Sequence, residues 1–245
     1  MKKIALCFLT YGNLSKSKFW NDLLDSNLDK FNIYIHNKKK FKDNNFEKYC
    51  LKKTVDTQWG HSSLVKATLT MFKDAIKNID NEHFLLLSDT CIPLYPLDYI
   101  YSEIFKENNN LIYVQNKTNV ARYDKKMLDK IFLKRSNFCK QSQWMCLTRN
   151  TIDFFIKKNY IKKFGKDFPI LDEHYFISLI KKYNIEYKQR LLTFCKFNQK
   201  NKTHPKKYKT LDKYIIAHKR SLGALFIRKI DPNCQNVELI LENVC

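Results

Sequence analysis

The chain has 245 residues, 44% of them hydrophobic and 14% aromatic, which suits one globular domain and excludes a largely disordered chain. No apolar run is long enough to span a bilayer, and no signal peptide with a cleavage site precedes the first strand-like segment. The formal charge of +21, from 45 Lys and Arg against 24 Asp and Glu, has two interpretations. One is an anionic partner, such as nucleic acid, an anionic membrane surface or a phosphorylated small molecule, and the other is codon bias.

The cysteines and glycines argue against several further classes of protein. The eight cysteines form no Cys-x-x-Cys pair and no zinc-finger spacing with histidine, so we expect free thiols in a cytoplasmic protein without structural zinc. Only four glycines occur in the whole chain, and they form no GxGxxG and no P-loop motif. The sequence therefore lacks the motifs that are typical of dinucleotide-binding enzymes and of P-loop enzymes.

Strand-like and helix-like segments alternate over the first 160 residues. Apolar runs predict strands over Lys3–Thr10, Phe31–His36, His83–Ser88, Leu111–Gln115 and Ser142–Thr148. Helices are expected over Lys18–Leu28, Ser62–Ile79, Leu97–Phe105, Lys125–Leu133 and Asn150–Lys158, with Ser62 or Ser63 as a cap. This alternation predicts an α/β fold, a three-layer α/β/α sandwich with a mostly parallel central sheet, in one domain spanning residues 1–245.

Shorter elements follow towards the C-terminus. We expect a helix over Asp172–Tyr183 with Asp172 as its cap, a strand over Leu191–Phe197 and a helix over Leu211–His218. The segment Ala224–Ile230 is largely apolar and ends at Asp231 and Pro232. Ligands of such folds bind at the carboxyl ends of the strands, where Thr10–Asn13, Ser88–Thr90 and the loop before Asp172 are polar.

The densest cluster of titratable side chains is Asp172-Glu173-His174. The dipole and free N–H groups of a helix N-terminus lower the pKa of a carboxyl there, and an ionised carboxylate can accept a proton from an attacking hydroxyl. Adjacent helical residues point in different directions, so the natural division is Asp172 as cap and Glu173 as base. Spacing alone leaves open that both acids merely cap the helix.

The chain has no Asp-x-Asp motif, so the carboxylates that commonly hold a divalent cation on a diphosphate are missing. Fixed cations can replace such a metal, and the candidates are Arg220 with Lys219, and Arg228 with Lys229. A solvated basic edge is the alternative for both pairs. Trp59, before Gly60, could stack on a base or a sugar or lie in the core, and Trp144 could be core or a pocket wall.

Several segments, in order along nearly the whole chain, resemble the core-2/I-branching family of glycosyltransferases, glycosyltransferase family 14, and above all its plant-type branch. The matching segments are Lys3–Tyr11, Val55–Gly60 followed by Ser63–Val65 and Ala67, Phe84–Leu94, Lys140–Arg149, Asp172–Phe176, His204-Pro205 and Leu225–Lys229. Each segment alone is modest evidence, whereas their common order along the chain is fairly specific.

The resemblance implies a GT-A fold and an inverting transfer, without metal or cofactor, from a UDP-sugar to a hydroxyl of a glycan or glycoprotein. It implies Glu173 as catalytic base and Lys229 as a diphosphate contact, with Arg228 and Arg220 as further basic candidates. The donor or acceptor pocket is expected to include Tyr11, Trp59, Gly60, Ser88, Asp89, Trp144, Asp172 and His174. UDP-N-acetylglucosamine is the first expected donor, and UDP-xylose or another UDP-hexose the second.

The chain departs from the family pattern at identifiable positions. Gln141 replaces the usual glycine before Ser-Gln-Trp, and Phe197 stands where a tryptophan is common. The membrane anchor usual in animal and plant members is not expected here, although the positive charge fits contact with an anionic membrane. Two other functions stay open, a basic nucleic-acid-binding protein and a non-catalytic sugar-binding relative, but no motif for specific nucleic-acid recognition supports the first.

Overall fold

The structure is a computed structural model that describes residues 1–42, 44–115, 128–129, 134–164, 168–197 and 205–242. The helix expected over Lys125–Leu133 falls largely outside the described residues, and His204 lies outside them. Within the described ranges, no helix is both long and apolar enough to cross a membrane. The seven described cysteines are free thiols.

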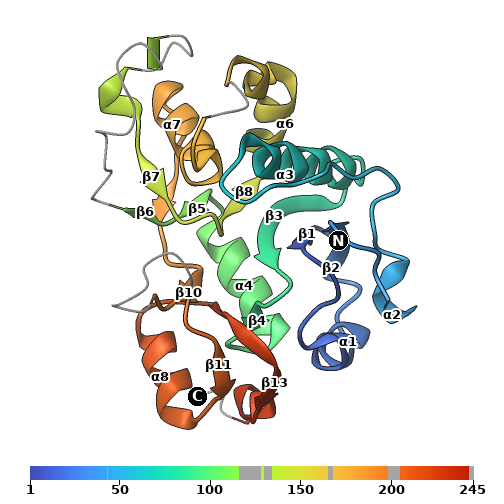
Figure 1. Ribbon diagram of the computed structural model, residues 1–245. Helices are drawn as coiled ribbons and strands as arrows, with labels where there is room; N and C mark the ends of the chain where they lie inside the picture. Colours follow the sequence, from blue (N-terminus) through green and yellow to red (C-terminus); the bar gives the residue numbers. More distant parts are fainter. Residues whose placement is uncertain (43, 116–127, 130–133, 165–167, 198–204, 243–245) are drawn as a thin grey trace.

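A six-stranded sheet forms the centre of the molecule (Figure 1). In spatial order its strands are β2 (Phe31–Asn37), β1 (Lys3–Thr10), β3 (Asn81–Ser88), β8 (Cys146–Thr148), β5 (Leu111–Ile112) and β9 (Lys188–Gln189). β1 is parallel to β2 and β3, and β5 is parallel to β9, whereas β8 runs antiparallel to both of its neighbours. The predicted α/β fold with a mostly parallel sheet is confirmed, with β8 as the reversed strand.

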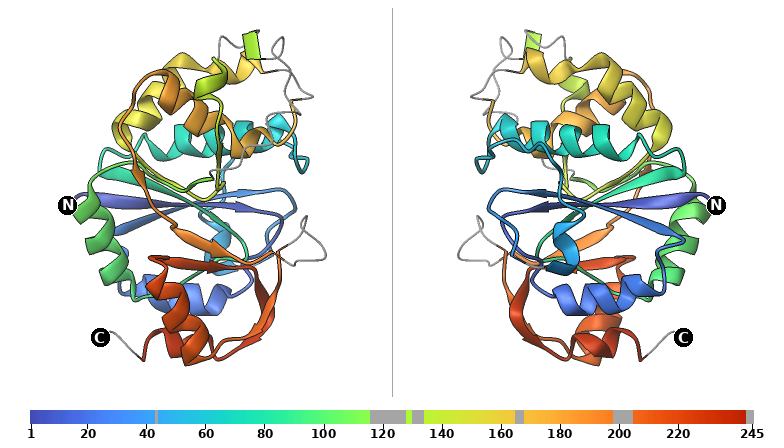
Figure 2. Two further views of the ribbon diagram at one scale, coloured as in Figure 1. Left: turned by 90° about the vertical axis from the view of Figure 1, so that its left-hand side faces the viewer. Right: turned by 90° about the vertical axis from the view of Figure 1, so that its right-hand side faces the viewer.

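Helices cover both faces of this sheet (Figure 2). The two-residue period of β1 sends Ala5 and Cys7 to one core and Ile4, Leu6 and Phe8 to the other. The first core packs against α3 (Ser62–Ala75), α6 (Arg149–Lys158) and α7 (Tyr175–Lys182), and the second against α1 (Ser17–Asp25) and α4 (Leu97–Glu107). The three predicted layers are therefore present.

The C-terminal part adds a smaller β structure below the sheet as drawn in Figure 1. It contains the three-stranded sheet β10 (Thr193–Cys195), β12 (Phe226–Arg228) and β4 (Ile92–Pro93), the pair β11 (Tyr208–Thr210) and β13 (Ile230–Gln235), and α8 (Lys213–Ser221). β4 follows the end of β3 directly and pairs antiparallel with β12. This pairing carries the residues after β12 to the carboxyl end of β3.

The remaining described elements are short. They are α2 (Asn44–Glu47), β6 (Val114–Gln115) paired with β7 (Lys140–Gln141), and the 3₁₀ helices η2 (Arg135–Asn137), η3 (Tyr160–Lys163), η4 (Leu171–Glu173) and η5 (Val237–Ile240). The strand expected over Leu111–Gln115 is broken in two, because its second half pairs with β7 outside the central sheet.

Several expected boundaries are wrong for reasons of tertiary contact. The helix expected over Asp172–Tyr183 is divided into η4 and α7, so His174, not Asp172, is the N-cap of α7. Neither Ser62 nor Ser63 caps α3, whose N-cap is His61. β13 continues through Pro232, which an edge strand with an irregular register tolerates.

Candidate active site

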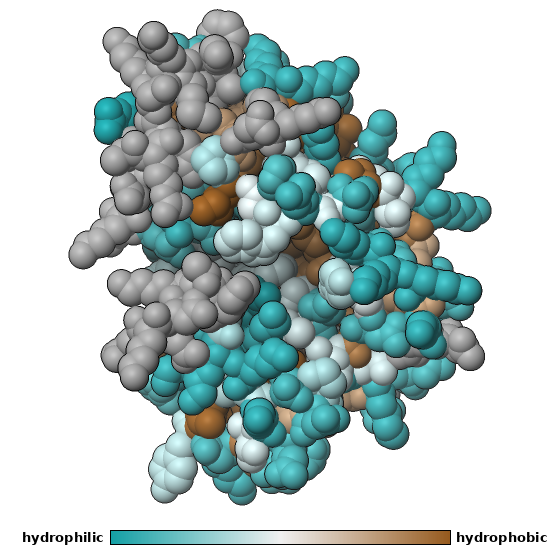
Figure 3. Space-filling view, viewed as in Figure 1, coloured by the Kyte–Doolittle hydropathy of each residue, from teal (hydrophilic) through white to brown (hydrophobic). Residues whose placement is uncertain are grey.

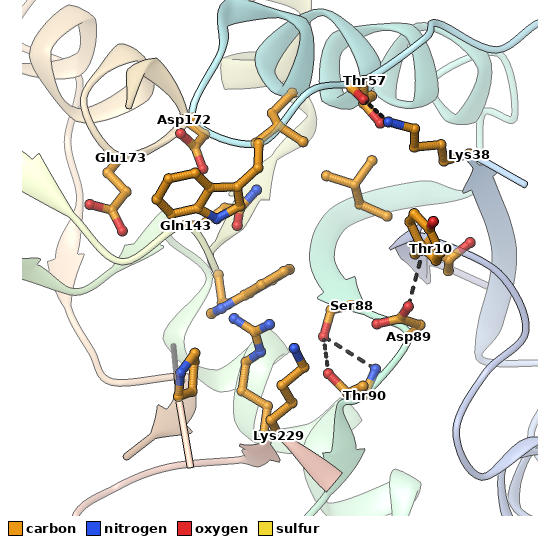
Figure 4. A pocket seen from close by; sticks show the side chains of 18 of the residues that line it. Thr10, Lys38, Thr57, Ser88, Asp89, Thr90, Gln143, Asp172, Glu173 and Lys229 are labelled. Atoms are coloured by element: carbon orange, nitrogen blue, oxygen red, sulfur yellow. Dashed lines mark hydrogen bonds between the residues drawn. The ribbon is translucent and has the colours of Figure 1, made fainter. Parts of the chain in front are cut away.

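A cleft of about 580 Å³ opens at the carboxyl ends of β1 and β3, between the central sheet and the C-terminal β structure (Figure 4). It is lined by Leu9, Thr10, Tyr11, Lys38, Thr57, Trp59, Gly60, Leu64, Ser88, Asp89, Thr90, Gln143, Trp144, Ile170, Asp172, Glu173, Phe197, Pro205, Arg228 and Lys229. The three polar strand ends predicted from the sequence therefore meet at one place, and Glu173 shares this cleft with Lys229.

The acidic turn after β3 forms one wall. The Oδ2 atom of Asp89 accepts a hydrogen bond from the backbone N–H of Tyr11 at 3.1 Å, and the carbonyl of Asp89 accepts one from Ser15 at 2.8 Å. Burial raises the pKa of Asp89, while that backbone bond and the charges of Arg228 and Lys229 act to lower it. These contacts fix a carboxyl group opposite two cations.

Arg228 and Lys229 form the basic wall. The guanidinium of Arg228 lies over the Trp144 ring, 4.3 Å from its centroid, so Trp144 is both a pocket wall and a platform for a cation. The Nε atom of Arg228 is buried and has no hydrogen-bond partner among the described residues. The backbone around these cations is fixed, because Ile230 N–H donates to the Thr90 carbonyl at 2.9 Å. The arrangement presents two positive charges to the cleft.

Asp172 and Glu173 contribute two adjacent carboxyl groups. An oxygen of Glu173, Oε2, lies 2.9 Å from the Nζ atom of Lys140, whereas Oδ1 of Asp172 is buried without a partner among the described residues. Burial, and then the charge of Glu173, raise the pKa of Asp172 to about 7. The sequence-based expectation that a helix N-terminus would lower this pKa is wrong, because burial outweighs the backbone hydrogen bonds that act to lower it.

A strained turn positions the carboxyl pair. Ile170 has a φ of 50°, an unfavourable value for a β-branched residue, and its N–H donates to the carbonyl of Gly60 at 2.8 Å. Gly60 itself has a φ of 74°, which glycine adopts readily. At the rim, the Trp59 side chain is 71% exposed and Tyr11 is 57% exposed. Two aromatic side chains therefore lie at the rim of the cleft, and Lys39 Nζ lies 4.7 Å from the centroid of the Tyr11 ring.

Two residues expected in this site lie elsewhere. Arg220 donates to the carbonyls of Leu94 and Ile240 and lies over the ring of Tyr95, so its guanidinium joins α8 to neighbouring segments and does not line the described cleft. His174 is buried behind the cleft and stacks on Phe138 at 4.7 Å. Burial lowers its pKa to about 4.

Lys140 and Gln143 belong to the site but were not named as site residues, whereas Thr90 lies in the polar strand end Ser88–Thr90 that was expected there. Thr90 and Gln143 line the cleft, and Lys140 forms the ion pair with Glu173. Lys140 and Gln143 stand inside the matching segment Lys140–Arg149, which was the available signal. The ion pair between Lys140 and Glu173, which are 33 residues apart in the chain, cannot be predicted from the spacing of residues in the sequence. Among the described residues, no three His, Cys, Asp or Glu side chains converge as a metal site.

The chain is similar to known proteins in sequence and in structure. Glycosyltransferase BC10 of Oryza sativa subsp. japonica is 23% identical over 218 residues, which cover 75% of this chain and 54% of the relative. The chain thus spans about half the length of this curated relative. A crystal structure of galactosyltransferase LgtC with donor and acceptor sugar analogues is 8% identical, with a TM-score of 0.41, over 77% of this chain and 75% of that one.

The family model described as Core-2/I-Branching enzyme matches residues 4–230, which include every element that lines the cleft. The α/β sandwich described above is compatible with the GT-A architecture that the resemblance implied. The chain therefore belongs to the core-2/I-branching enzyme family.

Proposed function

We propose that the chain is a glycosyltransferase that moves a sugar from a UDP-sugar to a hydroxyl of a glycan or glycoprotein, with inversion and without a metal ion. Family membership supports the class of reaction. The observation that carries the mechanism is the shared cleft, in which Glu173 lies with Arg228 and Lys229. A base for the acceptor and cations for the leaving group are the two requirements of such a transfer.

In the proposed step, Glu173 accepts the proton of the acceptor hydroxyl. The acceptor oxygen forms a bond to the anomeric carbon on the face opposite the nucleotide, and the bond from that carbon to the diphosphate oxygen breaks. The electron pair leaves with UDP, whose negative charge Lys229 and Arg228 stabilise. These fixed charges would act in a partly buried cleft, where they are worth more than in water.

The donor is proposed as UDP-N-acetylglucosamine, with UDP-xylose or another UDP-hexose second. A cleft of about 580 Å³ is within the range of small-ligand pockets, and its exposed aromatic rim fits stacking on a sugar. The carboxyl of Asp89 and the hydroxyls of Ser88 and Thr90 supply acceptors and donors for sugar or ribose hydroxyls. The donors are to be compared by thermal shift without added metal.

The test is Glu173→Gln, which keeps the shape of the side chain and removes its basicity. Turnover should fall by about 10²–10⁴-fold while UDP-sugar affinity is retained. The matched control is Glu82→Gln, because Glu82 also faces a lysine, has a side chain 30% exposed against 27% for Glu173, and does not line the cleft.

Transfer and slow donor hydrolysis are measured beside calorimetric titration of the donor. Wild-type turnover in Glu173→Gln would refute the base assignment. A donor that binds but is never turned over by the wild-type chain would instead indicate a non-catalytic sugar-binding protein.

A further inference from the structure

The ion pair between Lys140 and Glu173 places a cation on one of two adjacent carboxyl groups. Lys140 Nζ lies 2.9 Å from Glu173 Oε2, and the two side chains are 30% and 27% exposed. Asp172, next in the chain, faces the same cleft with a buried oxygen that has no partner among the described residues. The two acids therefore have unequal surroundings.

The position of Lys140 is fixed by both of its neighbours. The N–H of Cys139 donates to Ser178 Oγ at 3.2 Å, and Oε1 of Gln141 accepts from the N–H of Ile177 at 2.8 Å. Ser178 and Ile177 lie in the first turns of α7, the helix that follows Glu173. β7 is thereby attached to the start of this helix.

Gln141 is fully buried, and its Nε2 atom also donates to the carbonyl of Ser142 at 3.0 Å. A glycine at this position would supply none of these side-chain bonds. Gln141 therefore connects the strand that carries Lys140 to the helix that follows Glu173.

Asp172 resists ionisation more than an ordinary carboxyl group does. Burial and the charge of Glu173 raise the pKa of Asp172 to about 7, and Lys140 opposes this increase. Burial lowers the pKa of His174 to about 4, so its ring is neutral at pH 7. The other charged groups lining the cleft are Asp89, Arg228, Lys229 and Lys38. Among the described residues, Lys140 is the cation that forms an ion pair with Glu173.

We propose that Lys140 is a positioning residue that keeps the negative charge of the carboxyl pair on Glu173 and holds that carboxylate in place, with Gln141 fixing Lys140. This role rests on the proposed sugar transfer. In the reaction, the Glu173 carboxylate would take up the acceptor proton and lose its charge. Lys140 would remain beside the resulting neutral acid.

The test is Lys140→Met, with Lys188→Met as the matched control. Lys188 pairs with Glu107 at 2.8 Å, away from the cleft, so the control removes an ion pair of similar length, while Glu107 keeps its second partner, Arg190. Lys140→Met should lower kcat by roughly 10²-fold without changing the donor KM, because a misplaced base affects the chemical step. Lys140→Arg should recover most of the activity.

The pH profile separates this role from a merely structural one. Lys140 acts to lower the pKa of Asp172, so its loss moves the titration of Asp172 to higher pH. A limb of the kcat profile that reports these adjacent carboxyl groups should therefore shift upward in Lys140→Met and stay unchanged in Lys188→Met. A lowered kcat with an unmoved limb would overturn the proposal.

The same titration is followed without turnover by carbon NMR of chains labelled at the Asp and Glu carboxyls. An upward shift in Lys140→Met supports the role of Lys140, and coincident wild-type and variant curves overturn it. Suppose that the carboxyl titration shifts but the wild-type chain neither transfers a sugar from a sugar nucleotide nor hydrolyses the nucleotide. The proposed function then fails, while the pairing of Lys140 with Glu173 is supported. Thermal unfolding of each variant confirms that the compared chains are folded.

Discussion

Arg228 and Lys229 are neighbours in the chain but have different surroundings in the cleft. Arg228 stacks on Trp144 and has a buried, unpartnered Nε among the described residues, whereas the carbonyl of Lys229 accepts from Tyr208 at 2.8 Å. The aromatic ring limits the directions open to the guanidinium, and the amine of Lys229 is the more adaptable point charge. We expect Lys229 to contact the diphosphate directly.

Replacement of Lys229 by alanine should weaken UDP binding by about 1.5–3 kcal/mol, the range for hydrogen bonds to charged groups. Titration calorimetry at fixed ionic strength measures this loss. Lys213→Ala serves as the control, because Lys213 is exposed, lies in α8 and does not line the cleft. Unchanged UDP affinity in Lys229→Ala would remove this residue from the donor site.

Motif matching selected Glu173 and Lys229, which the structure places in one cleft, but it gave no information on burial or side-chain direction. Arg220 was proposed from its position in a basic stretch, and the structure directs it to backbone carbonyls instead. His174 is one residue from the proposed base, yet the turn sends it behind the cleft. Residues adjacent in sequence diverge here because η4 is a single tight turn.

At the scale of elements, the start of α7 depends on a distant side chain. His174 is its N-cap but makes no side-chain cap bond, and the N–H of Ile177 is satisfied by Gln141, which lies 36 residues earlier in the chain. The first N–H groups of a helix have no partners within it. A capping rule that examines only neighbouring residues selects Asp172 and misses Gln141.

Gln141→Gly should lower the free energy of unfolding by about 1–3 kcal/mol, because it leaves a buried N–H without a partner. Urea unfolding measures the difference. Gln189→Gly is the control: Gln189 also lies in a two-residue strand and also bonds to backbone, but it is exposed, so water can replace its bonds. Equal losses in both variants would show that Gln141 has no special capping role.

The long strands and helices were predicted well because their apolar patterns extend over several turns or pleats. β1 and β3 are continuous buried runs, and α3 presents one apolar stripe. The short strands β4 and β7 were not predicted, and β6 was predicted only as the end of a longer strand, since two paired residues leave almost no periodic pattern. These short pairs nevertheless place Lys140 and the basic wall.

At the scale of the whole molecule, positive charge is distributed over the surface as well as in the cleft. Figure 3 shows a mostly hydrophilic face with a small hydrophobic area near its middle. The α/β class and the three layers follow from patterns along the whole chain, whereas the single domain of residues 1–245 stays a prediction. Total charge gave no guide to the site, because the cleft also contains Asp89, Asp172 and Glu173.

Turnover should be unchanged by EDTA, because Arg228 and Lys229 are proposed to stabilise the departing diphosphate. Initial rates with and without EDTA, and after addition of magnesium, measure this independence. Potassium chloride at matched ionic strength is the control, since salt screens exposed charges. A loss of activity in EDTA that magnesium restores and potassium chloride does not would require a metal in the reaction.

The peptide bond of Gly60 has one further consequence. Its carbonyl holds Ile170, two residues before Asp172, while the preceding residue carries the exposed ring of Trp59. A chain that evolved to bind a different sugar through changes in this loop would also move the segment that carries Glu173, the proposed base. A change of sugar specificity at the rim of the cleft is thus constrained by the backbone hydrogen bond between Ile170 and Gly60, which a comparison of side chains would not show.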